Sequence, residues 1–341
     1  MRGAVLGLLA GMALAGPASA APVTVEVTAK AETAPVGTGN ADAADDPAIW
    51  RNPANPAASL IVATDKKAGL YLYGLDGRPR DFSPDGRLNN VDLVDMGAAG
   101  VIVVASDRND EARAKLRLYR LDTRAAKLVP LGTVEAGWGE GYGVCLWRQG
   151  KALHAFSVMK HGFVSQVAID LSGAAPAGEI VRWLKLATQT EGCVVDPRSA
   201  TLFVGEEDRG IWAFDARAGA AIDGRLVAEV DGAQLVADVE GLALAPVGRR
   251  GGWLVASSQG DNAYALFKLP GMTPAGRFRI AAGKLGATEE TDGIALATGS
   301  FGGQYPAGLF VAQDGENAPA AQNFKLVSWA DVLAALNGGS R

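Results

Sequence analysis

The amino-acid sequence predicts an all-β protein, specifically a six-bladed β-propeller with four-stranded blades. A small pattern, a polar residue followed by a short apolar run, returns six times along the chain at near-equal spacing. With Asp46, Val91, Tyr142, Glu191, Glu240 and Asp292 as markers, the steps are 45, 51, 49, 49 and 52 residues. Periods of this size are typical of repeat architectures, and four strand-like runs per period are typical of a propeller blade.

Each repeat contains further β-rich runs after its marker. The second run covers residues 60–64, 101–105, 152–156, 202–205, 253–256 and 309–312. The third covers 70–73, 116–119, 165–169, 211–214, 264–267 and 324–327. Several of these alternate apolar and polar residues, which is the period of a half-buried strand. The fourth run is weaker and more polar, as at 127–131, 182–186 and 277–280, and this suits the outer edge of a sheet.

The last repeat lacks a fourth strand, because the chain continues into residues 330–336, which have the pattern of a short helix. A spare strand-like run lies at the other end of the chain, in residues 23–28. We therefore expect the N-terminal strand to complete the last blade and close the ring. An open solenoid or a β-sandwich fits six evenly spaced units and a displaced strand less well.

Residues 1–20 match a secretory signal peptide. Arg2 supplies a positive charge, residues 5–14 are apolar, and residues 18–20 form a small-residue cleavage site. We expect a secreted or periplasmic protein whose residues 21–341 form a single domain. The apolar run is well short of the ~20 residues that span a membrane. With a net charge of −5, the chain lacks the excess of basic residues that is typical of nucleic-acid-binding proteins. We expect no membrane or nucleic-acid partner, and a monomer.

In a propeller the innermost strand of each blade begins near one end of the central channel. The carboxylates at these positions are Asp45, Asp46, Glu191, Asp238, Glu240 and Asp292. The turns between second and third strands face the same end and carry Lys66, Lys67, Arg108, Lys160, Glu207, Gln259 and the segment 314–317. Carboxylates this close repel one another, and hard cations that prefer oxygen ligands, above all calcium, relieve the repulsion. Two histidines and two cysteines at unsuitable spacings exclude a zinc site.

Each of these features alone has a simpler interpretation. An acidic residue before a glycine at a strand start is more often a turn than a ligand, and Lys66-Lys67 alone fits a solvated turn. Repetition at equivalent positions favours a shared site. The segment Asp314-Gly315-Glu316-Asn317 fits a tight turn and a separate structural calcium loop equally well.

The two cysteines, Cys145 and Cys193, come just after Gly143 and Gly192, the glycines that follow the markers Tyr142 and Glu191 in consecutive repeats. Equivalent positions of neighbouring repeats can lie close together, and export permits disulfides, so we expect a bridge between them. Two buried free thiols are the alternative, because the sequence alone does not give the separation of the two Cα atoms.

Eight segments together resemble the β-propeller phytases, the calcium-dependent alkaline phytase family. They are DAADDPAIW (42–50), LNNVD (88–92), QTEG (189–192), GEED (205–208), DVEGL (238–242), ASSQG (256–260), TDG (291–293) and GLFVAQDGEN (308–317). They extend over nearly the whole chain after the leader, and the fold inferred from the repeats is also the fold of that family. Two departures stand out. One residue is extra between Glu32 and Asp45, and the turn after Asn317 is shorter.

The resemblance implies a set of site residues. Calcium ligands would be Glu32, Asp45, Asp46, Glu191, Glu207, Asp238, Glu240 and Asp292, with a backbone carbonyl from Val91 and a structural ion near Asp314, Glu316 and Asn317. Phosphate contacts would come from Lys66, Lys67, Arg108, Tyr142 and Lys160, with Gln259 at the rim. Within this set we expect catalysis to depend on Glu191, Glu207, Glu240, Asp292 and Lys66.

The resemblance also implies the reaction, that of a 3-phytase. Phytate, myo-inositol hexakisphosphate, would enter as its calcium complex and leave as lower inositol phosphates and inorganic phosphate. Several calcium ions would offset the substrate charge, and a water activated between two of them would attack phosphorus directly. The chain has no Arg-His-Gly motif and no Cys-x5-Arg loop, so a covalent phosphoenzyme of those two kinds is not expected.

Two other functions compete with this one. A calcium propeller hydrolase such as a lactonase needs one central ion and no group of cations, whereas Lys66, Lys67, Arg108 and Lys160 together favour a phosphate substrate. A non-enzymatic binding propeller would expose apolar or aromatic residues around the channel mouth, where this sequence places charged ones.

Overall fold

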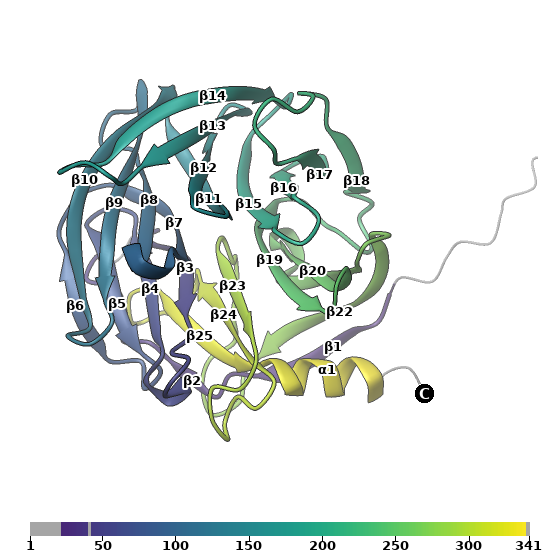
Figure 1. Cartoon of the computed structure of the whole chain (residues 1–341). Helices are drawn as coiled ribbons and strands as arrows, with labels where there is room; N and C mark the ends of the chain where they lie inside the picture. The colour runs from purple at the N-terminus through teal and green to yellow at the C-terminus, as the bar shows by residue number, and fades with distance from the viewer. Residues whose placement is uncertain (1–21, 40–41, 339–341) are drawn as a thin grey trace, which may run out of the picture.

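The computed structural model describes residues 22–39 and 42–338, and in it six β-sheets form a closed ring around a central channel (Figure 1). From the innermost strand outward, the first three blades are β3 (Ala44–Trp50), β4 (Leu60–Asp65), β5 (Gly69–Gly74) and β6 (Pro79–Ser83); β7 (Leu88–Asp95), β8 (Val101–Asp107), β9 (Arg113–Asp122) and β10 (Lys127–Trp138); and β11 (Gly141–Gln149), β12 (Ala152–Met159), β13 (Phe163–Asp170) and β14 (Ala177–Lys185).

The remaining three blades follow the same plan. They are β15 (Thr190–Asp196), β16 (Thr201–Glu206), β17 (Gly210–Asp215) and β18 (Arg225–Glu229); β19 (Val239–Val247), β20 (Gly251–Ser258), β21 (Ala263–Lys268) and β22 (Thr273–Ala281); and β23 (Ile294–Thr298), β24 (Gly308–Asp314) and β25 (Asn323–Ser328) with β2 (Ala31–Glu32). The predicted six-bladed all-β fold is confirmed. The predicted C-terminal helix is α1 (Trp329–Gly338), and no helix of the described residues is long and apolar enough to cross a membrane.

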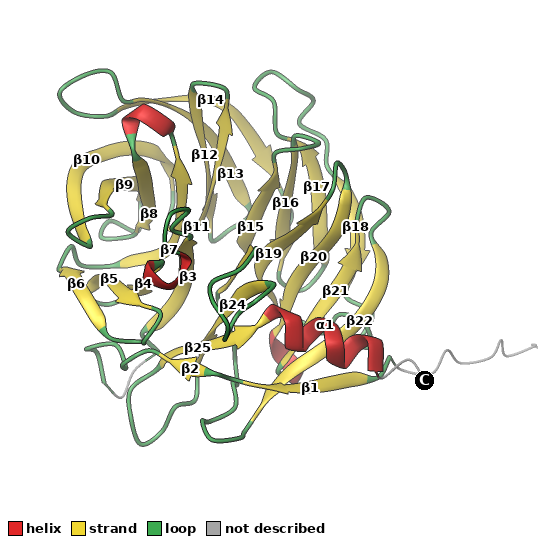
Figure 2. Cartoon of the chain, turned by 60° about the horizontal axis from the view of Figure 1, so that its bottom comes forward, coloured by secondary structure: helices red, strands yellow, loops and turns green. Residues whose placement is uncertain are grey.

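The N-terminal segment closes the ring as predicted, but through other residues. β2 pairs antiparallel with β25 and supplies the fourth strand of the sixth blade. The predicted closing strand, 23–28, forms β1 (Thr24–Thr28) and pairs in parallel with β22, so the fifth blade has five strands (Figure 2). The reason lies in its apolar side chains. Val25 and Val27 pack into the core beneath α1, together with Phe278 and Trp329.

Apolar side chains between neighbouring sheets form the core, one cluster for each pair of blades. Val62 and Leu72 of the first blade, for example, pack against Val91 and Val103 of the second. Burial of such side chains contributes roughly 25 cal/mol per Å² of apolar surface, so six such interfaces hold the blades face to face. The rigid stack fixes where each innermost strand begins, and these strand starts form the channel mouth.

The innermost strand begins with a β-bulge in five blades. The pairing with the second strand skips residues 45–46, 89–90, 142, 191–192 and 240–241. An extra residue in one strand bends it and redirects its side chains. In the first two blades a hydroxyl satisfies the freed backbone, because Thr64 Oγ1 accepts from the N–H of Asp46 and Ser106 Oγ from that of Asn90, each at 2.9 Å.

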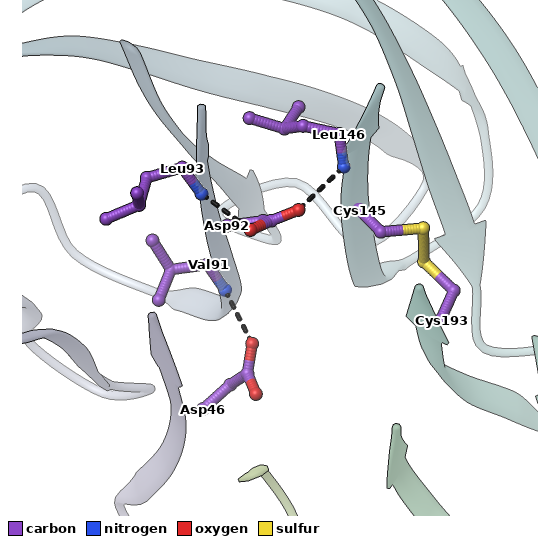
Figure 3. The surroundings of a disulfide bond; sticks show 7 residues. All are labelled: Asp46, Val91, Asp92, Leu93, Cys145, Leu146 and Cys193. Atoms are coloured by element: carbon purple, nitrogen blue, oxygen red, sulfur yellow. Dashed lines mark hydrogen bonds between the residues drawn. A yellow bond between two sulfur atoms is a disulfide. The ribbon is translucent and has the colours of Figure 1, made fainter. Parts of the chain in front are cut away.

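Side chains and backbone groups join neighbouring innermost strands to one another (Figure 3). Asp46 Oδ2 of β3 accepts from the backbone N–H of Val91 in β7 at 3.0 Å. Asp92 Oδ2 of β7 accepts from the N–H of Leu146 in β11 at 2.8 Å. Cys145 of β11 and Cys193 of β15 form a disulfide, with 5.7 Å between their Cα atoms. These links hold four consecutive strand starts at fixed positions around the mouth.

Glycine permits the close approach of the next strands. A Cβ at Gly143 would lie 1.9 Å from the carbonyl oxygen of Glu191, and one at Gly192 would lie 2.1 Å from that of Glu240. Since no real Cβ tolerates such distances, a side chain at either position would force the innermost strands apart. The acidic residues that follow each other around the mouth are therefore held closer than side-chain packing alone would allow.

We predict that denatured, unreduced protein contains no free thiol and that reduction releases two. The bridge joins residues 48 apart in sequence, and in the loop-entropy model such a crosslink stabilises the fold by roughly 4 kcal/mol. Thiol titration in denaturant, before and after reduction, measures the first quantity, and urea unfolding of both forms measures the second. Two titratable thiols before reduction would contradict the prediction.

Candidate active site and metal centre

The first residue after the second strand of each blade faces the channel mouth. These six residues, called here the turn ring, are Lys66, Arg108, Lys160, Glu207, Gln259 and Gly315. Their backbone N–H groups donate, at 2.7 to 3.2 Å, to the carbonyl oxygens of Ala43, Arg87, Glu140, Gln189, Asp238 and Glu289, just before the innermost strands. The same backbone bond in every blade explains why turns far apart in sequence converge on one face.

A second set lies closer to the axis, and we call it the mouth ring. Its members are Asp45, Asn89, Tyr142, Glu191, Glu240 and Asp292. The first five belong to the β-bulges, and Asp292 directly precedes Gly293, whose N–H donates to the carbonyl oxygen of Asp45 at 3.0 Å. The four carboxylates, one amide and one phenol of this ring therefore come from six different blades.

Two sequence markers lie elsewhere than expected. The sequence spacing aligns Asp46 and Val91 with Glu191, but the structure places Asp45 and Asn89 at that position. The bulges define the equivalence, because the pairing with the second strand skips residues 45–46, 89–90 and 191–192 in the three blades. Asp46 and Val91 instead line the channel below the mouth, in a cavity of about 500 Å³. The Val91 N–H donates to Asp46 Oδ2, so the two residues lie side by side in this cavity.

Four members of each ring line a cavity of about 740 Å³ at the channel mouth; Arg108, Lys160, Asp45 and Asn89 are not among its lining residues. The predicted site residues that line it are Lys66, Tyr142, Glu191, Glu207, Asp238, Glu240, Gln259, Asp292, Glu316 and Asn317. The lining residues that the sequence did not single out are chiefly Asp42, Gln189, Glu290 and Gln313. Asp42, Gln189 and Gln313 lie inside matching segments but were assigned no role, and Glu290 lies outside them.

Three glutamates form the centre of this cavity. Glu191, Glu207 and Glu240 each offer a carboxylate oxygen, and these oxygens lie within 4.8 Å of one another. All three residues are buried. Within the described part of the chain, Glu207 Oε1 and Glu240 Oε2 have no hydrogen-bond partner. Buried anionic oxygens without donors are costly unless a cation meets them, so this donor set fits a hard metal ion.

The electrostatics of the apo protein show the same need for positive charge. Burial, followed by the charges of Asp45 and Glu240, raises the pKa of Glu191 well above its usual range. Burial, followed by Asp292 and Glu207, does the same to the pKa of Glu240. The pKa of Glu207 rises to about 7 and that of Asp292 to about 8, again chiefly through burial. Without a metal, these groups retain protons in order to coexist.

Lys66 supplies part of the missing positive charge. Its ammonium lies 2.9 Å from Asp45, 3.0 Å from Asp292 and 2.8 Å from Asp42. Burial alone would lower the pKa of Lys66, but Asp45 and Asp292 outweigh that effect and raise it, so the side chain stays charged. A buried lysine held by three carboxylates is a fixed cation at the edge of the acidic triad.

Two further cations, Arg108 and Lys160, lie over the ring of Tyr142, and we call them the cationic arc. The Arg108 guanidinium and the Lys160 ammonium lie 5.4 and 5.0 Å from the centre of that ring, within cation–π range. Burial, then the charge of Glu191, raises the pKa of Tyr142, so its hydroxyl remains protonated and can donate. Two cations and one hydroxyl donor thus stand beside the acidic triad, an arrangement suited to an anion that also contacts a metal.

Adjacent acidic residues at the end of β16 have different roles. Glu206 is fully buried and accepts from Ala187 N, Thr188 N and Trp212 Nε1 at 2.7 to 2.9 Å. These bonds fix the segment that leads into Glu191. Glu207 points instead into the cavity and joins the triad. The pair of glutamates in the sequence therefore contains one structural and one site residue.

Some predicted site residues gather elsewhere. Glu32, Asp314 and Asn317 surround the ammonium of Lys325, which is fully buried and lies 2.5, 3.0 and 3.2 Å from their oxygens. These three oxygens thus already face a cation. Glu316 is exposed on the cavity rim. Lys67 is exposed, and among the described residues its side chain has no contact with either ring.

Comparison with known proteins identifies the family of this chain. A family model described as Phytase matches residues 3–340. The 3-phytase of Bacillus subtilis (strain 168) is 38% identical over 325 residues, which cover 90% of this chain and 84% of that protein. The PQQ-bound aldose sugar dehydrogenase of Streptomyces coelicolor has a TM-score of 0.55 at 13% identity, over 90% of this chain and 100% of that one, a likeness of fold alone. With a family match over nearly its whole length, the chain belongs to the phytase family.

Proposed function

We propose that this protein is a secreted, calcium-dependent 3-phytase that hydrolyses phytate to lower inositol phosphates and inorganic phosphate. The observation that carries the proposal is a buried acidic triad in the mouth cavity with cations beside it: Lys66 lines the same cavity, and Arg108 and Lys160 lie over the ring of Tyr142, which also lines it. The 3-phytase relative and the family match support the same activity. Secretion rests on the leader pattern of residues 1–20, which lie outside the described residues.

Glu191, Glu207 and Glu240 would hold calcium, with Asp45, Asp238 and Asp292 beside them. Six to eight flexible oxygen ligands suit calcium better than magnesium or zinc. Bound there, calcium would supply Lewis-acid polarisation of a phosphate and lower the pKa of a water. We infer that Asp46 and the Val91 carbonyl hold calcium in a structural role within the channel. We do not propose Glu32, Asp314 and Asn317 as calcium ligands, because their oxygens contact the ammonium of Lys325.

The chain's own cations would bind and orient the substrate. Arg108 and Lys160 stand where a phosphate next to the triad would reach them, and Tyr142 offers a protonated hydroxyl between them. Lys66 would contact the phosphate from the side of Asp45 and Asp292, where its charge is fixed. Charges that are already in place when the substrate arrives stabilise the developing negative charge without reorganisation.

The cavity does not match the competing functions. One central ion, as a lactonase requires, would leave the extra carboxylates and the cationic arc without a role. A binding propeller would present apolar side chains, but Tyr142 is the one aromatic residue among those lining this cavity. The direct test is release of phosphate from phytate by the purified protein, with calcium and after chelation. Release that needs calcium supports the proposal, and no release with calcium present refutes it.

We expect Glu191→Ala to abolish turnover while Lys160→Ala mainly weakens substrate binding. Loss of Glu191 removes a metal ligand, so kcat should fall at least ~100-fold. Loss of Lys160 removes a charged contact to phosphate, so KM should rise ~10-fold with a smaller change in kcat. Steady-state kinetics at saturating calcium measure both. A Glu191→Ala variant with near-normal kcat would remove the central ligand from the proposal.

We also expect the chelated protein to lose stability as pH rises. The raised pKa values of Glu207 and Asp292, about 7 and about 8, mean that the folded state binds more protons than the unfolded state. Stability is then greatest below the unfolded pKa values and falls as pH rises through the folded ones. Thermal unfolding in chelator should show Tm falling by several degrees between about pH 5 and about pH 8.

Calcium provides the control for that experiment. An ion that binds only the folded state raises stability by mass action, and here it would replace the retained protons. The fall in Tm with pH should therefore shrink when millimolar calcium is present. A chelated protein whose Tm stays constant or increases over this pH range would show that the carboxylates do not repel as described.

A further inference from the structure

Asn89 occupies an unusual place in the mouth ring. Four of the other five members are carboxylates, and the fifth, Tyr142, stands beside the cationic arc. Asn89 is almost completely buried and comes from the bulge of the second blade. Its side chain is neutral and offers both two donor hydrogens and an acceptor oxygen. It can therefore meet carboxylates on one side and a cation on the other without adding charge to the cavity.

The contacts of Asn89 use both ends of its amide. Nδ2 donates to Glu191 Oε1 at 2.8 Å and to Asp45 Oδ2 at 3.1 Å. Oδ1 accepts a short hydrogen bond from Nη1 of Arg108. Nη2 of the same guanidinium forms a close ion pair with Glu140, just before β11. One rigid amide thus connects the acidic triad, through Glu191, to the cation that faces the phosphate position.

We propose that Asn89 is a positioning residue that fixes Glu191 and Arg108 relative to each other. The inference rests on the proposed function, in which Glu191 holds calcium and Arg108 contacts a phosphate. Outer partners of metal ligands orient them, and their loss typically costs 10–100-fold in affinity or activity. Here the same partner also orients the anion-binding group, so one side chain sets the spacing between metal and phosphate contact.

The neighbouring Asn90 contacts only Glu191 of the two residues that Asn89 joins. With its amide nitrogen facing its acceptors, Asn90 donates to Glu191 Oε1 and to the carbonyl oxygen of Tyr142, each at 2.8 Å. It therefore supports the triad, but no contact links it to Arg108 within the described residues. Asn89 is the member of the pair that reaches both groups, and the two ends of its amide can be tested separately.

Two substitutions separate the ends. Asn89→Asp keeps an oxygen for Arg108 but loses the donor to Glu191, so kcat should fall ~10–100-fold with KM within about threefold of wild type. Asn89→Ala loses both contacts, so kcat should fall and KM should rise ~10-fold. Asn109→Ala is the matched control, because that amide contacts Asp107 and the backbone of Asp85 and Arg87 and neither ring. Its kcat and KM should stay near wild type.

A readout without turnover completes the test. The calcium concentration at half-maximal thermal shift should rise ~10-fold in Asn89→Ala and stay unchanged in Asn109→Ala. This midpoint tests Asn89 even if the wild type released no phosphate from phytate, an outcome that would refute the proposed function alone. Should the alanine variant not fold, the near-isosteric Asn89→Asp carries the test. Wild-type kcat and calcium midpoint in both variants, or an equal rise of KM in both, would overturn the proposal.

Discussion

Mutual repulsion among buried carboxylates is the constraint on which the rest of this structure depends. The fold brings Asp45, Glu191, Glu240 and Asp292 to one opening, and burial raises the pKa values of Glu191, Glu240 and Asp292. Glycines at the strand starts allow neighbouring strands to lie this close, and the disulfide between β11 and β15 restrains those two strands from separating. The charge must be offset inside the cavity, in part by Lys66 and in part by whatever cation binds there. The site therefore requires a cation even in the absence of substrate.

The propeller makes this arrangement possible through repetition. A backbone hydrogen bond of the same kind in every blade places one turn residue at the mouth, and a β-bulge in five blades adds another. Since the backbone is the same throughout, each blade can contribute a different side chain without disturbing the ring. Lysine, arginine, glutamate and glutamine therefore occupy equivalent positions, and the chemistry of the cavity comes from their order around the axis.

The sequence was sufficient to predict the fold and many of the residues that line the mouth cavity, and its failures have local causes. Even spacing and alternating strands predicted the blades, and turn positions predicted the converging carboxylates and cations. The closing strand was misassigned because pairing partners depend on packing under α1, which no periodicity reports. Asn89 was missed because a neutral amide gives no charge signal, although it lies in the matching segment 88–92. The partner of Glu32 was missed because Lys325 lies within an ordinary strand pattern.

Calcium binding to the chelated protein, measured by isothermal titration calorimetry in buffers of different ionisation enthalpy, tests the central claim most directly. If the raised pKa values of Glu207 and Asp292 reflect carboxylates that hold protons in place of metal, binding must release protons near neutral pH. The account predicts tight binding with a measured proton release that grows smaller as pH rises above about 8. Absence of binding, or binding with no exchange of protons at neutral pH, would contradict it.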